Sequence, residues 1–343
     1  MSTVSNVTTH AFKASNNLNQ DEKSLLLNLP VEIITKIGID VSKGNHGAND
    51  AINFGRACAL THLITHDEKE IRQEITRVAH IENESLNKMW NRLSKAIQLK
   101  EGEKPKTLDA IRKWFRDPKN EPRLNAIKCL YLEECGLKVI PIEISKLTEL
   151  KSLHLSYNEI EILPEFLGNL LKLENLFIAH NKICSLSKSL GDLPNLKSLA
   201  LYNNKICSLP ESLGNLLKLQ NLFLSTNKIS SLPESIGNLL NLEYLGLNDN
   251  KFTELPKSLG KITRLQRLCF DNNQISSLPK SLGNLINLKI FSFKNNKVNT
   301  LPEIFENLTE LEELFIRDNK IEALPESLIN LKNDRGIFLR IEQ

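Results

Sequence analysis

The fold is indicated most directly by a stretch that reads SLPESLGNLLKLQNLFLSTN, residues 208–227. Its last nine residues follow the pattern L-x-x-L-x-L-x-x-N, and the asparagine that ends this pattern recurs every 23 residues along the chain. The asparagines are Asn158, Asn181, Asn204, Asn227, Asn250, Asn273, Asn296 and Asn319. An internal repeat of this length predicts stacked structural units, because one unit is too small to bury its own leucines.

The repeats extend beyond these eight asparagines at both ends. The first unit begins at Ile127 and has Cys135 in the asparagine position, and nine units cover 127–333. Leu153 and Leu155 alternate with polar residues, which predicts one half-buried strand in each unit. The segment GIFLRI, residues 336–341, predicts one last strand.

The pattern and its period resemble the leucine-rich-repeat family over 127–343. The resemblance implies an α/β fold, a horseshoe-shaped solenoid with a parallel sheet on its concave side. The asparagine column is expected to be a buried ladder that hydrogen-bonds the backbone, with Cys135 as its first member. The recurring glycines, such as Gly214 and Gly237, are expected at tight turns or where a short helical turn ends.

The concave face is the predicted binding surface. All four tyrosines and three phenylalanines fall at strand positions that point outward, and charged residues join them in the last three units. The predicted partner-binding residues are Tyr131, His154, Tyr157, Phe177, His180, Tyr202, Phe223, Tyr244, Asp249, Arg267, Asp271, Lys294, Phe315 and Arg317. Exposed aromatic residues and arginine are typical of protein interfaces. The alternative is that the rings only pack on neighbouring strands.

The residues before the repeats predict a separate, all-helical region. Residues 1–20 are polar and are predicted to form a disordered tail, and 21–65 and 66–126 are predicted to be two helical segments. A long helix is expected over 67–97 with Asp67 as its N-cap, and a short one between Thr107 and Asp117. Trp114 and Phe115 of the short helix are expected to cover the open core of the first repeat.

Part of this region resembles an F-box. The motif Leu-Pro-x-Glu-Ile begins at Leu29, and a second apolar helix, AINFGRACALTHLI (51–64), follows it. In the F-box family such a module binds the Skp-type adaptor of cullin-based ubiquitin ligases. The positions carried over are Leu29, Pro30, Ile33, Ile37, Phe54 and Cys58. The alternative is that these helices only cap the solenoid or form an unrelated module.

The short helix before the repeats and the near-identity of successive units also resemble bacterial leucine-rich-repeat effectors. Together the two resemblances imply an effector in the host cell cytoplasm that recruits a ubiquitin-ligase complex while its concave face holds a target protein. Without an effector role, a cytoplasmic location is still expected from the sparse cysteines. The alternative is a stand-alone binding or inhibitory protein that sequesters a host protein or another effector.

Composition and motifs weigh against other classes. The chain has 44 basic and 41 acidic residues, which does not provide the field that nucleic-acid binding needs. No apolar run approaches the roughly 20 residues of a membrane span. His62 and His66 stand four residues apart, but no further metal ligand accompanies them. P-loop, G-x-S-x-G and H-E-x-x-H motifs are lacking, so we expect no catalytic residues, cofactor or metal, and no enzyme.

Overall fold

A computed structural model describes the backbone of residues 68–335 and 338–340, and the side chains of residues 76–333. The chain divides into two compact units, Met1–Glu84 and Ser85–Gln343. The description below concerns the second unit and the helix that leads into it. The predicted tail, the F-box-like segment with its six carried-over positions, Asp67 and the two histidines at 62 and 66 lie outside the described residues.

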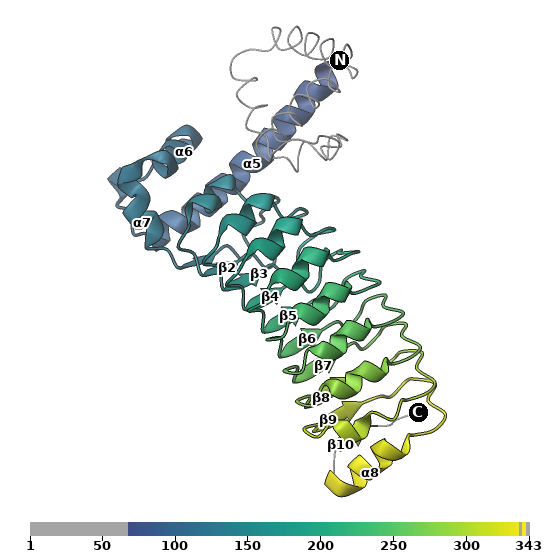
Figure 1. The fold of residues 1–343 in the computed structure, drawn as a ribbon. Coiled ribbons are helices and arrows are strands. Elements are labelled where there is room, and N and C mark those ends of the chain that lie inside the picture. The colour runs from purple at the N-terminus through teal and green to yellow at the C-terminus, as the bar shows by residue number, and fades with distance from the viewer. Residues whose placement is uncertain (1–67, 336–337, 341–343) are drawn as a thin grey trace, which may run out of the picture. The chain divides into compact units, whose positions relative to one another are not determined.

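Within the described part of the chain, from residue 68 on, three α-helices precede the repeats (Figure 1). They are α5 (Glu68–Ala96), α6 (Leu108–Arg116) and α7 (Glu121–Asn125), with short 3-10 helices at Glu101–Glu103 and Pro118–Asn120. The helices predicted over 67–97 and between Thr107 and Asp117 are confirmed as α5 and α6. The Thr107 hydroxyl caps α6 by accepting a hydrogen bond of 3.2 Å from the Ala110 amide, which satisfies an amide that would otherwise lack a partner.

The repeats build one parallel sheet of ten strands in sequence order (Figure 1). The strands are β1 (Cys129–Tyr131), β2 (Ser152–His154), β3 (Asn175–Phe177), β4 (Ser198–Ala200), β5 (Asn221–Phe223), β6 (Tyr244–Gly246), β7 (Arg267–Cys269), β8 (Ile290–Ser292), β9 (Glu313–Phe315) and β10 (Phe338–Arg340). Neighbouring strands pair at equivalent repeat positions, as Leu153 does with Leu176. The predicted parallel sheet is confirmed, including its last strand.

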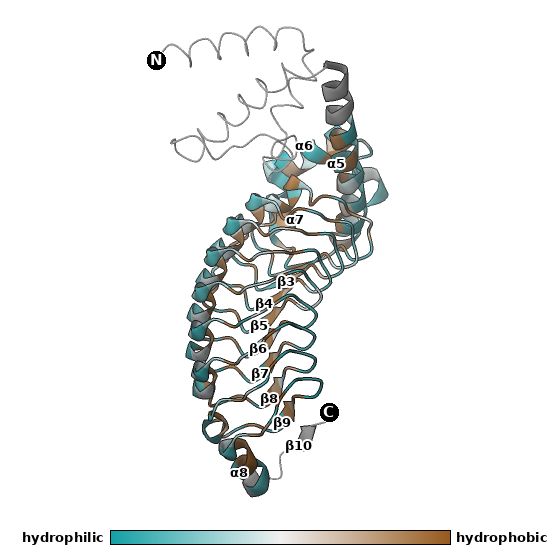
Figure 2. Cartoon of the chain, turned by 90° about the vertical axis from the view of Figure 1, so that its right-hand side faces the viewer, coloured by the Kyte–Doolittle hydropathy of each residue, from teal (hydrophilic) through white to brown (hydrophobic). Residues whose placement is uncertain are grey.

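A short helix follows each of the first nine strands on the opposite side of the repeat (Figure 2). In eight units it is a 3-10 helix: Ile142–Lys146, Glu165–Asn169, Lys188–Asp192, Glu211–Asn215, Glu234–Asn238, Lys257–Lys261, Lys280–Asn284 and Phe305–Asn307. After β9 the α-helix α8 (Glu326–Arg335) takes its place. Five of these 3-10 helices open with Glu or Lys directly after a proline, as Glu211 follows Pro210.

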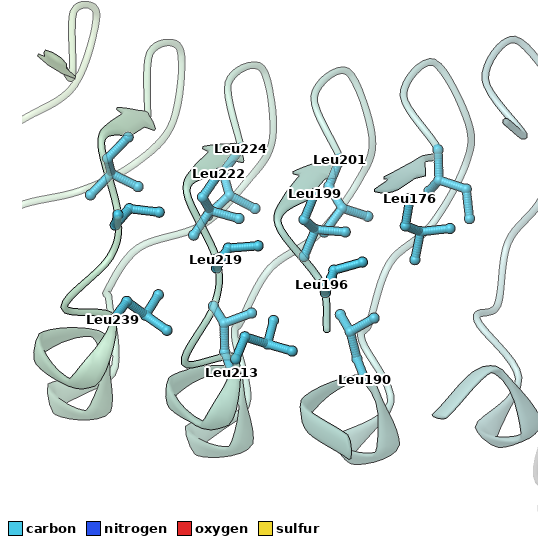
Figure 3. Close-up of a cluster of buried hydrophobic side chains, with 14 of the residues drawn as sticks. Leu176, Leu190, Leu196, Leu199, Leu201, Leu213, Leu219, Leu222, Leu224 and Leu239 are labelled. Atoms are coloured by element: carbon cyan, nitrogen blue, oxygen red, sulfur yellow. The ribbon is translucent and has the colours of Figure 1, made fainter. Parts of the chain in front are cut away.

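Leucines fill the space between the strands and the 3-10 helices (Figure 3). In the unit around β5, Leu213, Leu219, Leu222 and Leu224 are at most 1% exposed. The same positions are buried in the neighbouring units, so the core is one continuous cluster from Leu86 to Leu331. This continuity is why a single unit is not expected to fold by itself.

The open end of this core is covered by aromatic side chains. The Trp90 ring of α5 lies 5.0 Å from the Trp114 ring and 5.7 Å from the Phe115 ring of α6, in edge-to-face geometry. Trp90 and Phe115 are each 4% exposed and belong to the continuous core. Trp114 packs against the same core, as expected for Trp114 and Phe115, and Trp90 joins them there.

The asparagine ladder is also confirmed. Asn227 accepts a hydrogen bond from the Ile206 amide at 3.0 Å and donates to the carbonyls of Leu201 and Leu224, each at 3.0 Å. At the start of the ladder the Asn158 side chain accepts from the Cys135 amide. Each asparagine therefore ties its own turn to the previous one, which satisfies backbone groups that are shielded from water.

The main reason why glycine recurs at these positions differs from the expected one. Gly214 lies inside a 3-10 helix, and a Cβ atom added to it would be 2.4 Å from the Ser235 carbonyl oxygen of the next unit. The same contact would be 2.6 Å for Gly237 and Ser258. Gly214 does stand where a short helical turn ends, as one of the two alternatives predicted, but glycine is required there because adjacent 3-10 helices approach closely.

Candidate functional site: the sheet face

The sheet face is the exposed face of the parallel sheet together with the residues directly after each strand. Tyr131, His154, Phe177, Phe223 and Phe315 are the third residues of their strands, and Tyr244 and Arg267 are first residues. Two further groups follow the strands. Tyr202, Asp271, Lys294 and Arg317 lie two residues after a strand, and Tyr157, His180 and Asp249 lie three residues after one. The strand register therefore brings the predicted site residues into a few parallel rows.

The first ring row joins Tyr131, His154 and Phe177 across β1, β2 and β3. The centre of the imidazole ring of His154 lies 4.4 Å from that of Tyr131 and 4.9 Å from that of Phe177. Its Nε2 is 2.9 Å from the Ser152 hydroxyl and its Nδ1 is 3.5 Å from the Glu133 carboxylate. Tyr131 is 56% exposed, so this row ends in an accessible phenol ring.

The second ring row joins Tyr157, His180 and Tyr202 beyond the strand ends. The Tyr157 and His180 rings stack with 4.2 Å between centroids and 10° between planes, and Tyr202 meets His180 edge-on at 5.2 Å. Tyr157 is 52% exposed and Tyr202 is 37% exposed. The rings therefore contact those of neighbouring units, and these contacts leave both phenols accessible.

The backbone of this second row is strained. Tyr157 and His180 have φ angles of 59° and 53°, in the left-handed region. Five other units place asparagine or aspartate at the same position, as with Asn203 and Asp249 at 55°, and two place Glu134 and Thr226 there at 55° and 56°. Asparagine, aspartate and histidine are the non-glycine residues that tolerate this conformation best. For other L-residues the left-handed region costs roughly 1–2 kcal/mol. Tyr157 therefore occupies a position at which asparagine or aspartate would cost less, as Glu134 and Thr226 also do.

A third ring contact joins β5 and β6. The Phe223 and Tyr244 ring centroids are 4.7 Å apart. A Cβ atom on Gly246 would be 2.9 Å from the Tyr244 ring, so that glycine lets the ring lie flat against its own strand. Burial raises the pKa of the Tyr244 phenol. Small residues at the third strand position, such as Ala200 (4% exposed), are covered by their neighbours and add little to the accessible surface.

The last three units form the charged part of the sheet face. The Asp271 carboxylate accepts hydrogen bonds from the Ser292 hydroxyl at 2.6 Å and the Lys294 amide at 2.7 Å. The Lys294 ammonium lies 3.5 Å from Asp271 and 5.3 Å from the centre of the Phe315 ring. Burial, with Asp271 nearby, raises the pKa of the Cys269 thiol to about 11. Asp271 therefore ties the ends of β7 and β8 together, and Arg267 and Asp318 are exposed charges of this part.

The sequence interpretation missed the polar partners of the two histidines. Ser152 and Glu133 contact His154, and the Asn203 side-chain amide contacts His180. The signal was present, because Asn203 lies 23 residues after His180 and parallel units place such residues side by side. Among the residues described, no cluster of three or more His, Cys, Asp or Glu could hold a metal ion. No helix in the same part of the chain is long and apolar enough to cross a membrane.

Comparison with protein families identifies the repeats. A family model described as a leucine-rich repeat region matches residues 234–333. The leucine-rich-repeat model itself matches residues 149–170, 195–216 and 218–239. The repeats of this chain are leucine-rich repeats. The family resemblance stated from the sequence is therefore confirmed for the repeats.

Solved leucine-rich-repeat structures resemble this chain. The plant peptide hormone receptor RGFR1, in complex with RGF2, is 32% identical over 60% of this chain and 34% of its own, with a TM-score of 0.54. A second structure is the ectodomain of the plant membrane receptor kinase GASSHO1/SCHENGEN3 from Arabidopsis thaliana in complex with CASPARIAN STRIP INTEGRITY FACTOR 2. It is 36% identical over 62% of this chain and 26% of its own, with a TM-score of 0.54.

A leucine-rich-repeat protein of Leptospira interrogans, LIC12759, is 27% identical over 65% of this chain and 79% of its own, with a TM-score of 0.40. The two plant receptors are much longer, so this chain spans about a third and a quarter of their lengths. No curated protein matches the chain.

Proposed function

We propose that this leucine-rich-repeat protein binds a protein or peptide through its sheet face. The observation that carries the proposal is the second ring row, in which Tyr157 and Tyr202 are exposed on either side of the His180 ring. Exposed aromatic rings in a row are costly without a partner that covers them. Leucine-rich-repeat ectodomains similar to this chain have been solved in complexes.

The two parts of the sheet face have different roles in this proposal. The ring rows of β1 to β6 supply apolar contact area, because tyrosine and phenylalanine bury much surface with few rotatable bonds. Arg267 and Lys294 at the other end supply charges that select a partner and fix its orientation. The expected ligand is therefore apolar or aromatic along one part of its surface and bears acidic groups near β7 and β8.

The test is the double substitution Phe223→Ala with Tyr244→Ala in the full chain. Each ring, if it anchors the partner, contributes about 2 kcal/mol or more, so the double variant should bind at least a few hundredfold more weakly. The partner is captured by affinity purification and its affinity is then measured by calorimetry. The control is Ile142→Ala with Ile329→Ala, which removes exposed apolar groups outside the sheet face. Equal affinity for the wild type and the Phe223/Tyr244 variant contradicts the proposal.

A finer proposal concerns Leu29, Pro30 and Ile33. We propose that the F-box-like segment recruits a Skp-type adaptor while the sheet face holds the target, which makes the protein an effector acting in a host cytoplasm. The support is the sequence motif, LPVEI at residues 29–33. The alternative is a stand-alone binding or inhibitory protein.

The two are separated by Leu29→Ala with Pro30→Ala in the full chain, since a deletion through residue 100 would remove the buried Trp90. Loss of Skp-type adaptor binding with target binding unchanged supports the recruiting role. No adaptor binding by the wild type, under conditions that capture a known F-box protein, leaves the stand-alone alternative.

A further inference from the structure

A second set of exposed apolar side chains lies away from the sheet face. Among the residues whose side chains are described, nine large hydrophobic ones are exposed, and three of these are tyrosines of the sheet face. Four others, Leu171, Leu217, Leu240 and Ile286, occupy one position of the repeat and are 50–58% exposed. The exposed Pro194 occupies the same position in the unit after Leu171, and the exposed polar Thr263 occupies it between Leu240 and Ile286. The five apolar residues are called the leucine row.

The leucine row lies on the segment that leads from each 3-10 helix back to the next strand. Leu217, for example, directly follows Leu216, the buried residue that ends the 3-10 helix Glu211–Asn215, and precedes β5. The row is thus separate from the asparagine turns, which come after each strand. It is also separate from the ring rows, so a ligand on the sheet face leaves it accessible.

The backbone of the leucine row is held by hydrogen bonds between units. The Asn195 amide group donates to the Leu171 carbonyl at 2.8 Å, and Asn241 donates to the Leu217 carbonyl at 2.7 Å. The exposed side chains are therefore displayed from a fixed backbone. A partner that binds them loses little conformational entropy on this side of the interface.

Two cations lie beside the central leucines. The Lys218 ammonium donates to the Asn195 side-chain oxygen at 2.7 Å, and the Arg264 guanidinium donates to the Asn241 side-chain oxygen at 2.7 Å. Both acceptors are neutral amides, so these hydrogen bonds do not offset the positive charge. At the equivalent position of an earlier unit, Lys172 instead forms an ion pair with Glu149. The middle of the leucine row is thus apolar with a positive border.

We propose that the leucine row docks an amphipathic α-helix of a partner protein, with acidic side chains beside its apolar stripe. Neighbouring strands in a sheet lie about 4.8 Å apart, and an α-helix rises about 5.4 Å per turn. A helix along the row therefore sets roughly one apolar side chain against each unit. Its acidic residues face Lys218 and Arg264, which selects an acidic helix over a basic one.

The test uses a defined probe, a fluorescent helical peptide with leucines spaced three and four residues apart and glutamates beside them. Binding to the full chain is measured by fluorescence anisotropy. Leu217→Asn with Leu240→Asn, and separately Lys218→Glu with Arg264→Glu, should each weaken binding at least about tenfold. Because all four residues lie at the surface, thermal unfolding should stay unchanged.

Each variant has a matched control. Ile142→Asn with Ile329→Asn makes the same polar change at exposed residues outside the leucine row. Lys205→Glu with Lys228→Glu reverses two exposed charges on the asparagine turns. Both controls should change the affinity less than about twofold, as should Phe223→Ala with Tyr244→Ala, which tests the sheet face alone.

Several outcomes would overturn the proposal. They are no peptide binding, equal binding of a scrambled peptide of the same composition, or equal weakening by the control variants. If the chain attaches to vesicles of phosphatidylserine and phosphatidylcholine only when the leucine row is intact, and does not bind the peptide, the row would be assigned to a lipid surface instead. A dimer in sedimentation equilibrium that Leu217→Asn with Leu240→Asn abolishes would assign it to a second copy of the chain.

Discussion

The interior of the repeats and the sheet face follow opposite rules, although they alternate along the same strands. The middle strand residue is leucine in β2, β3, β4 and β5 and is fully buried in each. The next residue, on the other face, is histidine, phenylalanine, alanine and phenylalanine in the same four strands. Positions that keep the same residue type from unit to unit hold the units together, and positions that vary can determine which partner binds.

The sharpest test of this comparison is a pair of adjacent residues in β5. Leu222→Ala removes a fully buried side chain from the core and should lower the free energy of unfolding by about 4 kcal/mol. Phe223→Ala, one residue later on the sheet face, loses one ring contact and should lower it by about 1 kcal/mol. Urea unfolding followed by circular dichroism measures both. Similar losses would mean that the sheet-face ring is a core residue.

The asparagine ladder tests the interior without changing its leucines. Asn227→Ala leaves the Ile206 amide and the Leu201 and Leu224 carbonyls without their side-chain partner. Buried polar groups without partners should lower the free energy of unfolding by about 3 kcal/mol. The exposed Asn215→Ala, at a position outside the left-handed region, is the control and should change it by less than about 0.5 kcal/mol. A small effect of Asn227→Ala would show that water replaces the ladder.

Glycine substitutions test the spacing between units. A Cβ atom at Gly214 would be 2.4 Å from a backbone oxygen of the next unit, so Gly214→Ala should lower the free energy of unfolding by about 2 kcal/mol. Gly283→Ala meets its nearest atom at 3.1 Å and should cost less. Gly102→Ala has no atom within 4 Å and should be neutral. Differential scanning calorimetry gives the order, and a different order would refute close packing as the cause.

The smallest expected effect concerns Glu149 on the outer surface. Hydrogen bonds from Lys172 and Lys128 lower the pKa of its carboxyl group to about 2. Because the folded state has the lower pKa, the ion pairs stabilise the protein above the unfolded pKa of about 4.3 and are lost as the pH falls toward 2. The difference in urea midpoint between the wild type and Glu149→Gln should shrink over this range. A constant difference would assign the effect to packing.

Much of the interior could be predicted because it depends on residue type at a fixed period. The 23-residue spacing predicted the strands, the asparagine ladder and the final strand at Phe338–Arg340. The helix cap at Thr107 and the covering role of Trp114 and Phe115 depend on local patterns and on the exposed end of a stack. These features can be predicted without knowing which side chains of neighbouring units are in contact.

The site was predicted less completely. Its rings were placed on the correct face, but the polar contacts of His154 and the satisfied carboxylate of Asp271 were not foreseen. Both depend on contacts between neighbouring units at side-chain resolution. The leucine row was missed for the same reason, since a leucine at a repeat position is usually buried and only the packed units show which ones face water.

By itself the sequence determined the stack of units, because a leucine pattern with one period can bury its apolar side chains only by repetition. The tertiary structure alone decided why the glycines are needed, which rings remain accessible and where the second apolar surface lies. These properties depend on the distance between adjacent units, about 4.8 Å in a parallel sheet. At that spacing a backbone oxygen excludes a Cβ atom at Gly214, while Leu217 stays 58% exposed.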